Sequence, residues 1–208
     1  MVNHPNAFIP SESLVAAEAI EQDLRRLAAA LTDDQFNAPT PAGGWSVAHC
    51  IEHMVLTGHA FLPKWDLALK EAATRRLYGT APFPYGCWYR FVLKTVEPPP
   101  YRIKTKTTRS LMPYSRRSIE DAIRYFLAMH RELTRRIGLS VGLDAGRARV
   151  QSPFVSWIWY PLGFSFDFAL THERRHLWQA WQVLHHFKDR ETAIVSSTPR
   201  KETIGVTL

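Results

Sequence analysis

Residues 170–179, LTHERRHLWQ, contain the side chains of this chain best suited to metal chemistry. His172 and His176 are four residues apart, a spacing that on a helix brings their Cβ atoms to about 5 to 6 Å. Both imidazoles could therefore reach one cation, and Glu173 between them could act as an acid or a base. Two histidines at this spacing can equally be held by hydrogen bonds and bind nothing. A third ligand elsewhere in the chain would decide between these interpretations.

The letters HERRH also match the HExxH signature of zinc proteases, in which two histidines bind zinc and the glutamate takes a proton from water. Two features make this the less favoured hypothesis. Both residues between Glu173 and His176 are arginines, whereas that helix is normally packed inside the protein and uncharged. The positions at which the longer metzincin motif has a glycine and a third histidine hold Gln179 and Gln182.

The composition favours one soluble domain. The chain has 208 residues, of which 46% are hydrophobic, enough to bury one sizeable core. Its most apolar stretch, residues 154–166, is shorter than the roughly 20 residues of a membrane span. The N-terminus lacks a basic start followed by an apolar run, and Cys50 and Cys87 are not in a C-x-x-C motif. We therefore expect a cytoplasmic protein over residues 1–208, with a bundle at about 12–187 and a polar C-terminal tail at about 188–208.

The charge is compatible with several partners. A formal net charge of +7 suits an anionic small molecule, nucleic acid or an acidic membrane about equally well. No nucleic-acid motif is present, so the expected partner is a small-molecule substrate rather than a specific nucleic acid or a membrane. Six of the positive charges, and no negative one, lie between Arg102 and Arg117, where they could attract an anionic substrate. Trp178 and Trp181 either pack on another helix or form an apolar patch suited to a homodimer.

Hydrophobic periodicity predicts an all-α protein with four helices. Ser11 or Ser13 could cap the first helix, Ser46 the second, and Ser118 with Asp121 the third. Pro63 should kink the second helix or mark its weak point. No strand alternation is convincing, and the long connections 78–117 and 138–163 are predicted as loops. The helices are expected to end near Leu31, to run from Val47 to Leu69, to follow Ser118 as far as Gly138, and to run from about Phe164 to Phe187.

Other histidines could supply the third ligand. His53 and His49 lie one turn apart in the second helix, but the apolar stripe of that helix centres on Ile51 and Leu62, nearly opposite to His53. Either this helix buries two faces, or His53 is exposed. His130 lies within the apolar stripe of the third helix, where a core role is the more frequent one. Gln179 shares the face of the histidine pair and could hydrogen-bond to a metal ligand.

The order Trp45-Ser46, His53 eight residues after the tryptophan, and THERRHLWQA near the C-terminus resembles the DinB-like superfamily, also called DinB/YfiT-like metalloenzymes. The likeness covers about residues 12–187. It implies an up-down-down-up four-helix bundle with two long connecting loops. It also implies that His53, His172 and His176 bind one divalent metal, whereas Glu173, Gln179, His49 and His130 keep only candidate roles in the catalysis or in the pocket.

The chemistry implied by this resemblance is that of a metal-dependent enzyme. Three imidazoles can hold zinc, nickel or iron(II) and leave at least one coordination position open, as catalytic sites do. Characterised members of the superfamily are largely thiol-dependent transferases and isomerases that use low-molecular-weight thiols, together with some hydrolases. We therefore expect a thiol-dependent S-transferase or a related isomerase or hydrolase. The alternative is a bundle that binds metal or a small ligand without catalysis.

Overall fold

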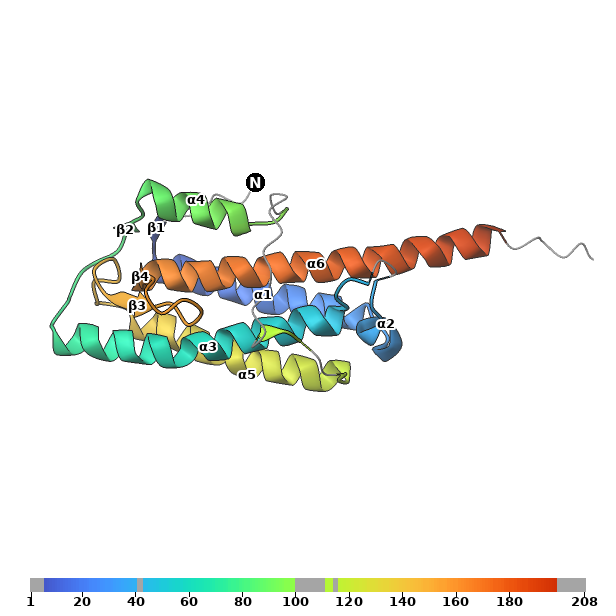
Figure 1. Cartoon of the computed structure of the whole chain (residues 1–208), viewed down its shortest axis with the longest axis horizontal. Helices are drawn as coiled ribbons and strands as arrows, with labels where there is room; N and C mark the ends of the chain where they lie inside the picture. Colours follow the sequence, from blue (N-terminus) through green and yellow to red (C-terminus); the bar gives the residue numbers. More distant parts are fainter. Residues whose placement is uncertain (1–5, 41–42, 100–110, 114–115, 198–208) are drawn as a thin grey trace, which may run out of the picture.

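Four long helices lie side by side and form the body of the molecule (Figure 1). The computed structural model describes residues 6–40, 43–99, 111–113 and 116–197. Each of α1 and α3 packs against both α5 and α6. Following the chain in Figure 1, α1 and α6 run in one direction and α3 and α5 in the other, so the order is up-down-down-up. The predicted all-α four-helix bundle is therefore confirmed, with helices α1 (Pro10–Ala29), α3 (Val47–Thr74), α5 (Ile119–Leu139) and α6 (Leu162–Ser197).

The connection between the parallel helices α3 and α5 contains a helix of its own. Helix α4 (Cys87–Val96) packs against α6 and buries Leu93, although Trp88 and Phe91 remain exposed. The expectation of a loop throughout 78–117 was therefore wrong for the residues of α4. With ten residues, α4 is shorter than the stretch over which helical periodicity is assessed in a sequence. Most of the basic segment 102–117 lies outside the described residues.

Two small antiparallel sheets close one end of the bundle. β1 (Ala7–Phe8) pairs with β2 (Phe83–Pro84), and β3 (Arg149–Gln151) pairs with β4 (Trp159–Pro161). The predicted loop 138–163 thus holds a hairpin. Strands of two or three residues are too short for an alternating pattern to reveal them.

Most of the predicted helix starts are confirmed. Ser46 Oγ accepts a hydrogen bond from the His49 backbone N–H, and Ser118 Oγ accepts one from the Asp121 N–H. The prediction for α1 was wrong, because this helix begins at Pro10 and places Ser13 inside its first turns. Proline suits the first turn because it lacks the N–H that would otherwise have no partner there. A further short helix, α2 (Asp33–Asn37), lies in the link before α3 and begins with a capping box at Thr32.

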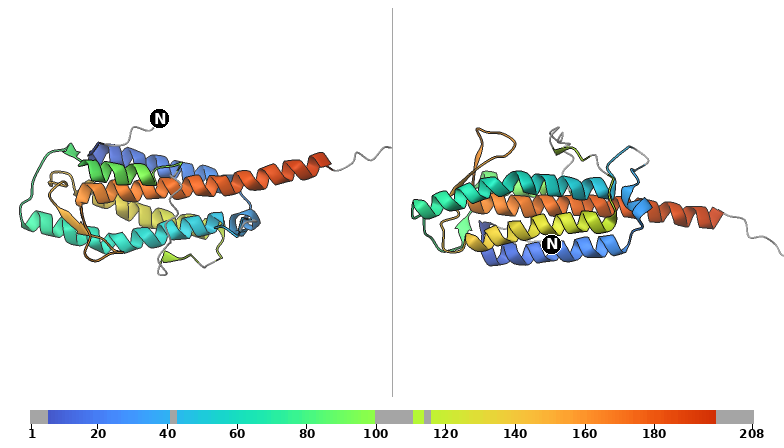
Figure 2. Two further views of the ribbon diagram at one scale, coloured as in Figure 1. Left: turned by 45° about the horizontal axis from the view of Figure 1, so that its top comes forward. Right: turned by 90° about the horizontal axis from the view of Figure 1, so that it is seen from below.

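Helix α6 is longer than predicted. It continues to Ser197 and projects beyond the other helices in every view (Figures 1 and 2). The expected polar tail is thus helical over residues 188–197, and residues 198–208 lie outside the described part. His185 and His186 lie within this helix and not at its C-terminus. None of the helices in the described ranges is both long and apolar enough to cross a membrane.

Helix α3 packs closely against α5 and α6, and this packing sets the position of His53. A Cβ atom on Gly58 would lie 2.1 Å from Met129 Sδ on α5, so the two helices approach at a point where only glycine fits without a shift. On the side toward α6, the Trp65 indole N–H donates to Ser165 Oγ at 2.9 Å. Helix α3 continues through Pro63 to Thr74, so it presents side chains to two neighbouring helices along most of its length.

Candidate metal centre

The structure brings three of the predicted histidines together. His53 comes from α3, and His172 and His176 come from α6. One ring nitrogen of each lies within 4.8 Å of those of the other two. Nε2 of His172 and Nε2 of His176 are 3.1 Å apart, and the His53 ring centroid lies 4.6 Å from that of His176. Residues distant in the chain thus form one cluster of imidazoles.

His53 is buried, with 5% of its surface exposed. The sequence left open whether the second helix buries two faces, and the structure shows that it does. Ile51 is also buried, and the side of α3 that carries His53 faces α6 while another side packs on α5. His53 therefore lies off the apolar stripe because α3 has a second interior face.

Neighbouring groups fix the orientation of two of the three rings. Nδ1 of His53 lies 2.9 Å from the backbone oxygen of Leu111, and Nδ1 of His176 lies 3.1 Å from Oε1 of Gln179. An Nδ1–H that donates to an oxygen leaves Nε2 unprotonated and able to bind a cation. Gln179 thus contacts a candidate ligand as predicted. The Trp45 indole stacks on His176 at 5.7 Å between ring centroids, a contact that the spacing of the motif did not reveal.

All three imidazoles favour the neutral form. Burial lowers the pKa of His53 and lowers that of His172 well below its usual value, with the neighbouring histidines adding to the effect on His172. For His176, burial and the charge of a protonated His53 lower the pKa to about 3. The rings are therefore neutral near pH 7, which is the state in which histidine binds a metal.

These residues fit a divalent cation. Zinc–imidazole bonds are about 2.0 to 2.1 Å long, so two nitrogens 3.1 Å apart can both bind one ion. Three protein ligands leave a position for water or substrate, which distinguishes catalytic from structural zinc sites. Because an all-imidazole set also suits nickel and iron(II), the donor set does not select one metal.

Comparison with known proteins places this arrangement in a family. The sequence pattern described as the DinB superfamily matches residues 16–180, which include all three histidines. The chain belongs to the DinB superfamily. Its structure is similar to that of YfiT from Bacillus subtilis, described as a probable metal-dependent hydrolase with an unusual four-helix bundle topology. The TM-score is 0.56 at 13% identity, over 86% of this chain and 87% of that one, so the likeness concerns the fold. No curated protein matches the chain significantly.

In this DinB-superfamily chain, Glu173 pairs with His130. Its Oε2 lies 3.0 Å from His130 Nδ1, and the two side chains are only 5% and 3% exposed. The other ring nitrogen of His130 lies 3.0 Å from the backbone oxygen of Ala17 on α1. Burial alone would lower the pKa of His130, but the Glu173 carboxylate beside it raises the pKa overall. The structure thus places both residues in a contact that joins α1, α5 and α6, and the catalytic role of Glu173 stays a prediction.

His49 takes a local position in this fold. Its Nδ1 accepts a hydrogen bond from the Ser46 backbone N–H at 3.3 Å, which completes the capping box of α3. His49 is not among the three histidines that the structure brings together. A carboxylate or amide usually occupies this position of a capping box, so a histidine there is easily mistaken for a site residue.

Arg174 lies nearly opposite His172 on a helical wheel, but its side chain does not point into solvent. Its guanidinium binds both carboxylate oxygens of Glu97, at 2.9 and 2.6 Å, and Glu97 is buried. Glu97 directly follows α4, which covers this side of α6 in the DinB-superfamily bundle. Because periodicity located no helix in residues 78–117, it could not predict that this face of α6 is covered. Trp181 is likewise anchored, since its indole N–H donates to Asp23 on α1.

Asp167 is a buried carboxylate that the sequence did not single out. It accepts hydrogen bonds from the Ser13 hydroxyl at 2.6 Å and the Tyr85 hydroxyl at 2.7 Å, and so joins α1, the segment before α4, and α6. Burial raises its pKa to about 6, although both hydrogen bonds favour the charged form. The only feature of the sequence that could have drawn attention to Asp167 is its acidic side chain in an otherwise apolar helix start.

This raised pKa predicts a measurable pH dependence. Between pH 3.8 and about 6 the folded chain keeps the Asp167 proton while the unfolded chain releases it, so stability falls as the pH rises. The contribution is about 3 kcal/mol. The Asp167→Asn variant lacks this titration. Its free energy of unfolding, measured in denaturant, should therefore increase relative to that of the wild type by about this amount from pH 3 to pH 7. The same difference at both pH values would contradict the assignment.

Proposed function

We propose that this protein is a metal-dependent enzyme that holds one divalent cation with His53, His172 and His176. The observation that carries the proposal is the cluster of three neutral imidazoles whose ring nitrogens lie within 4.8 Å. Membership of the DinB superfamily supports it. So does the description of the structurally similar YfiT as a probable metal-dependent hydrolase.

The chain's own residues prepare the site for such an ion. The Leu111 carbonyl and Gln179 hold two rings in place, and burial keeps all three histidines unprotonated. When bound, a divalent cation supplies the Lewis acidity that makes a water or a thiol a nucleophile near neutral pH. His172 is partly exposed, whereas His53 and His176 are buried.

Within this class we propose a thiol-dependent S-transferase, or a related isomerase or hydrolase, that acts on a small molecule. The enzyme would bring a low-molecular-weight thiol, or water, to an electrophilic substrate. Zinc, nickel and iron(II) are all candidates for the metal. A zinc-protease mechanism is disfavoured, because it would require Glu173 as the base, and this carboxylate lies against His130.

The experiment has two stages. Elemental analysis of the purified full chain, and its melting temperature with added zinc or nickel, establish whether a metal binds. Turnover of a panel of electrophiles with bacillithiol, mycothiol, glutathione or water is then compared between the wild type and the His176→Ala variant. His186→Ala is the matched control, because it removes an exposed histidine from the same helix. Loss of turnover in His176→Ala alone supports the proposal, whereas equal rates in all three proteins, or metal binding without turnover, contradict an enzymatic role.

A further inference from the structure

A cavity lies between α1 and α6, on the side of α6 that faces away from the three histidines. Its volume is about 250 Å³, and Glu12 and Val15 of its wall are exposed, so it opens to solvent along α1. At about 100° per residue, Asp167 and Arg174 of the same wall lie roughly 140° and 160° around α6 from His172. The cavity is therefore separate from the candidate metal centre.

Most of this wall is apolar. Its aliphatic residues are Ala7, Ile9, Val15, Ala16, Ala19 and Leu170. The alanines on α1 carry only a methyl group, which leaves room between the two helices. An engineered apolar cavity of about 150 Å³ binds benzene, so this larger one can hold a ring with a short polar substituent.

The Asp167 carboxylate is the main polar group of the wall. Only 6% of this residue is exposed, and its two oxygens accept hydrogen bonds from Ser13 at 2.6 Å and Tyr85 at 2.7 Å. Both donors are neutral hydroxyls, and a carboxylate can accept about four hydrogen bonds. Among the residues that the structure describes, no basic side chain forms an ion pair with Asp167. The carboxylate thus keeps unused acceptor positions and lacks a counter-charge.

The charges around the cavity favour a cation. Arg174 is the one basic residue of the described wall, and its guanidinium already binds both carboxylate oxygens of Glu97. Glu12 adds a further negative charge at the mouth. Burial raises the pKa of Asp167 to about 6, so the carboxylate is mostly charged at pH 7 although it has lost most of its hydration. A cationic ligand would supply the counter-charge that a buried carboxylate requires.

We propose that this cavity binds a small organic cation, a primary ammonium group carried by an apolar ring or branched chain, with Asp167 as its counter-charge. The ammonium group donates charge-assisted hydrogen bonds to the carboxylate, which Ser13 and Tyr85 hold in place. The aliphatic wall covers the apolar part of the ligand. This site is independent of the metal and of the proposed function, and it selects the opposite charge to that favoured by the net charge of +7.

Three probes that share one ring test the assignment on the full chain at pH 7. Benzylamine, benzyl alcohol and benzoate carry a positive, a neutral and a negative polar group, and isothermal titration measures the affinity of each. Because charge-assisted hydrogen bonds are stronger than neutral ones, benzylamine should bind about tenfold more tightly than benzyl alcohol. Benzoate should bind most weakly. Equal affinities for the amine and the alcohol, tighter binding of benzoate, or no binding of any probe would overturn the proposal.

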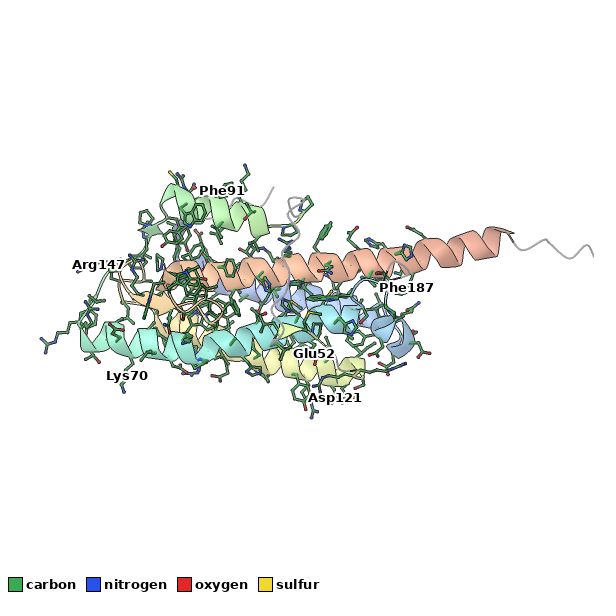
Figure 3. All side chains as sticks on the ribbon, viewed as in Figure 1. Glu52, Lys70, Phe91, Asp121, Arg147 and Phe187 are labelled. Carbon is green, nitrogen blue, oxygen red and sulfur yellow. The ribbon has the colours of Figure 1, made fainter. Side chains whose placement is uncertain are left out.

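Replacing Asp167 by asparagine removes the charge and keeps the shape of the side chain. The preference for benzylamine over benzyl alcohol should fall to near unity in Asp167→Asn. Asp121→Asn is the matched control, because the Asp121 side chain is 48% exposed and lies on α5, toward the other end of the bundle from the start of α6 (Figure 3). This control should keep the full preference. An undiminished preference in Asp167→Asn contradicts the assignment.

A second variant keeps the test decisive if Asp167→Asn does not fold. Ala16→Leu fills the cavity from a half-buried position of α1 with a residue that favours a helix. It should abolish measurable binding of benzylamine. Ala28→Leu, at a half-buried position of α1 outside the cavity wall, should leave the affinity unchanged. Melting temperatures identify any unfolded variant, and unchanged binding in folded Ala16→Leu contradicts the proposal.

A final arm separates this cavity from the metal centre, since an amine can also bind to a metal. Benzylamine affinity is compared in the zinc-loaded chain and after zinc is removed with a chelator. Equal affinities support the cavity between α1 and α6, whereas loss of binding together with the metal places the amine at the histidines and contradicts the proposal. A chain that binds benzylamine but no zinc contradicts the proposed function alone.

Discussion

Replacing His53 by alanine is expected to weaken zinc binding more than 100-fold. The reason is that the substitution removes one of three imidazoles whose nitrogens lie within 4.8 Å. Loss of an outer hydrogen-bond partner of a metal site typically costs about 10- to 100-fold in affinity, and loss of a ligand should exceed this. Isothermal titration of the metal-free full chain with zinc measures the effect directly.

Two other histidines of α3 are matched controls. His59 is exposed on the same helix, and His49 only completes the capping box at its start. Replacing either by alanine should leave the zinc affinity within a few-fold of that of the wild type. If zinc bound as tightly to His53→Ala as to the wild type, the pair on α6 would have to act with a different third ligand.

Replacing His130 by alanine should destabilise the fold by about 3 to 5 kcal/mol at pH 7, because it leaves the Glu173 carboxylate buried without its partner. Chemical denaturation followed by circular dichroism measures this loss. A smaller cost is expected for Glu173→Gln, since a neutral amide needs no counter-charge and His130 can release its proton.

A double-mutant cycle tests whether the loss of stability in His130→Ala comes from the broken charge pair with Glu173. If it is, His130→Ala should cost clearly less in the Glu173→Gln background than in the wild type. An equal cost in both backgrounds would show that His130 stabilises the chain through packing, or through its contact with the Ala17 carbonyl, and not through the glutamate. Zinc affinity of the folded variants shows, in addition, whether the pair affects the adjacent His172.

Much of the bundle could be predicted because its helices carry their own signals. Ser46 and Ser118 form the predicted N-caps, and the apolar stripes place the start of α3 and both ends of α5 almost to the residue. Helix α3 continues past the expected end at Leu69 to Thr74. The last helix was underestimated, since periodicity ends near Phe187 while α6 continues to Ser197. The mostly polar part of α6 beyond the bundle needs no apolar face, so no hydrophobic stripe in the sequence marks the end of this helix.

The site was harder to predict because its contacts cross between helices. The spacing of His172 and His176 predicts that they are neighbours, and the family resemblance added His53, which periodicity alone had left on an uncertain face. The partners of Glu173 and Arg174 could not be predicted at all. His130 and Glu97 lie far away in the chain, and only the packing of α5 and of the segment after α4 brings them to α6.

X-ray absorption spectroscopy of the zinc-loaded full chain tests the three-histidine site itself. We expect one zinc per chain, bound by three imidazoles at about 2.0 to 2.1 Å and at least one further light atom. A zinc–sulfur bond at about 2.3 Å from a cysteine, or a coordination sphere without three imidazoles, would contradict the proposed site.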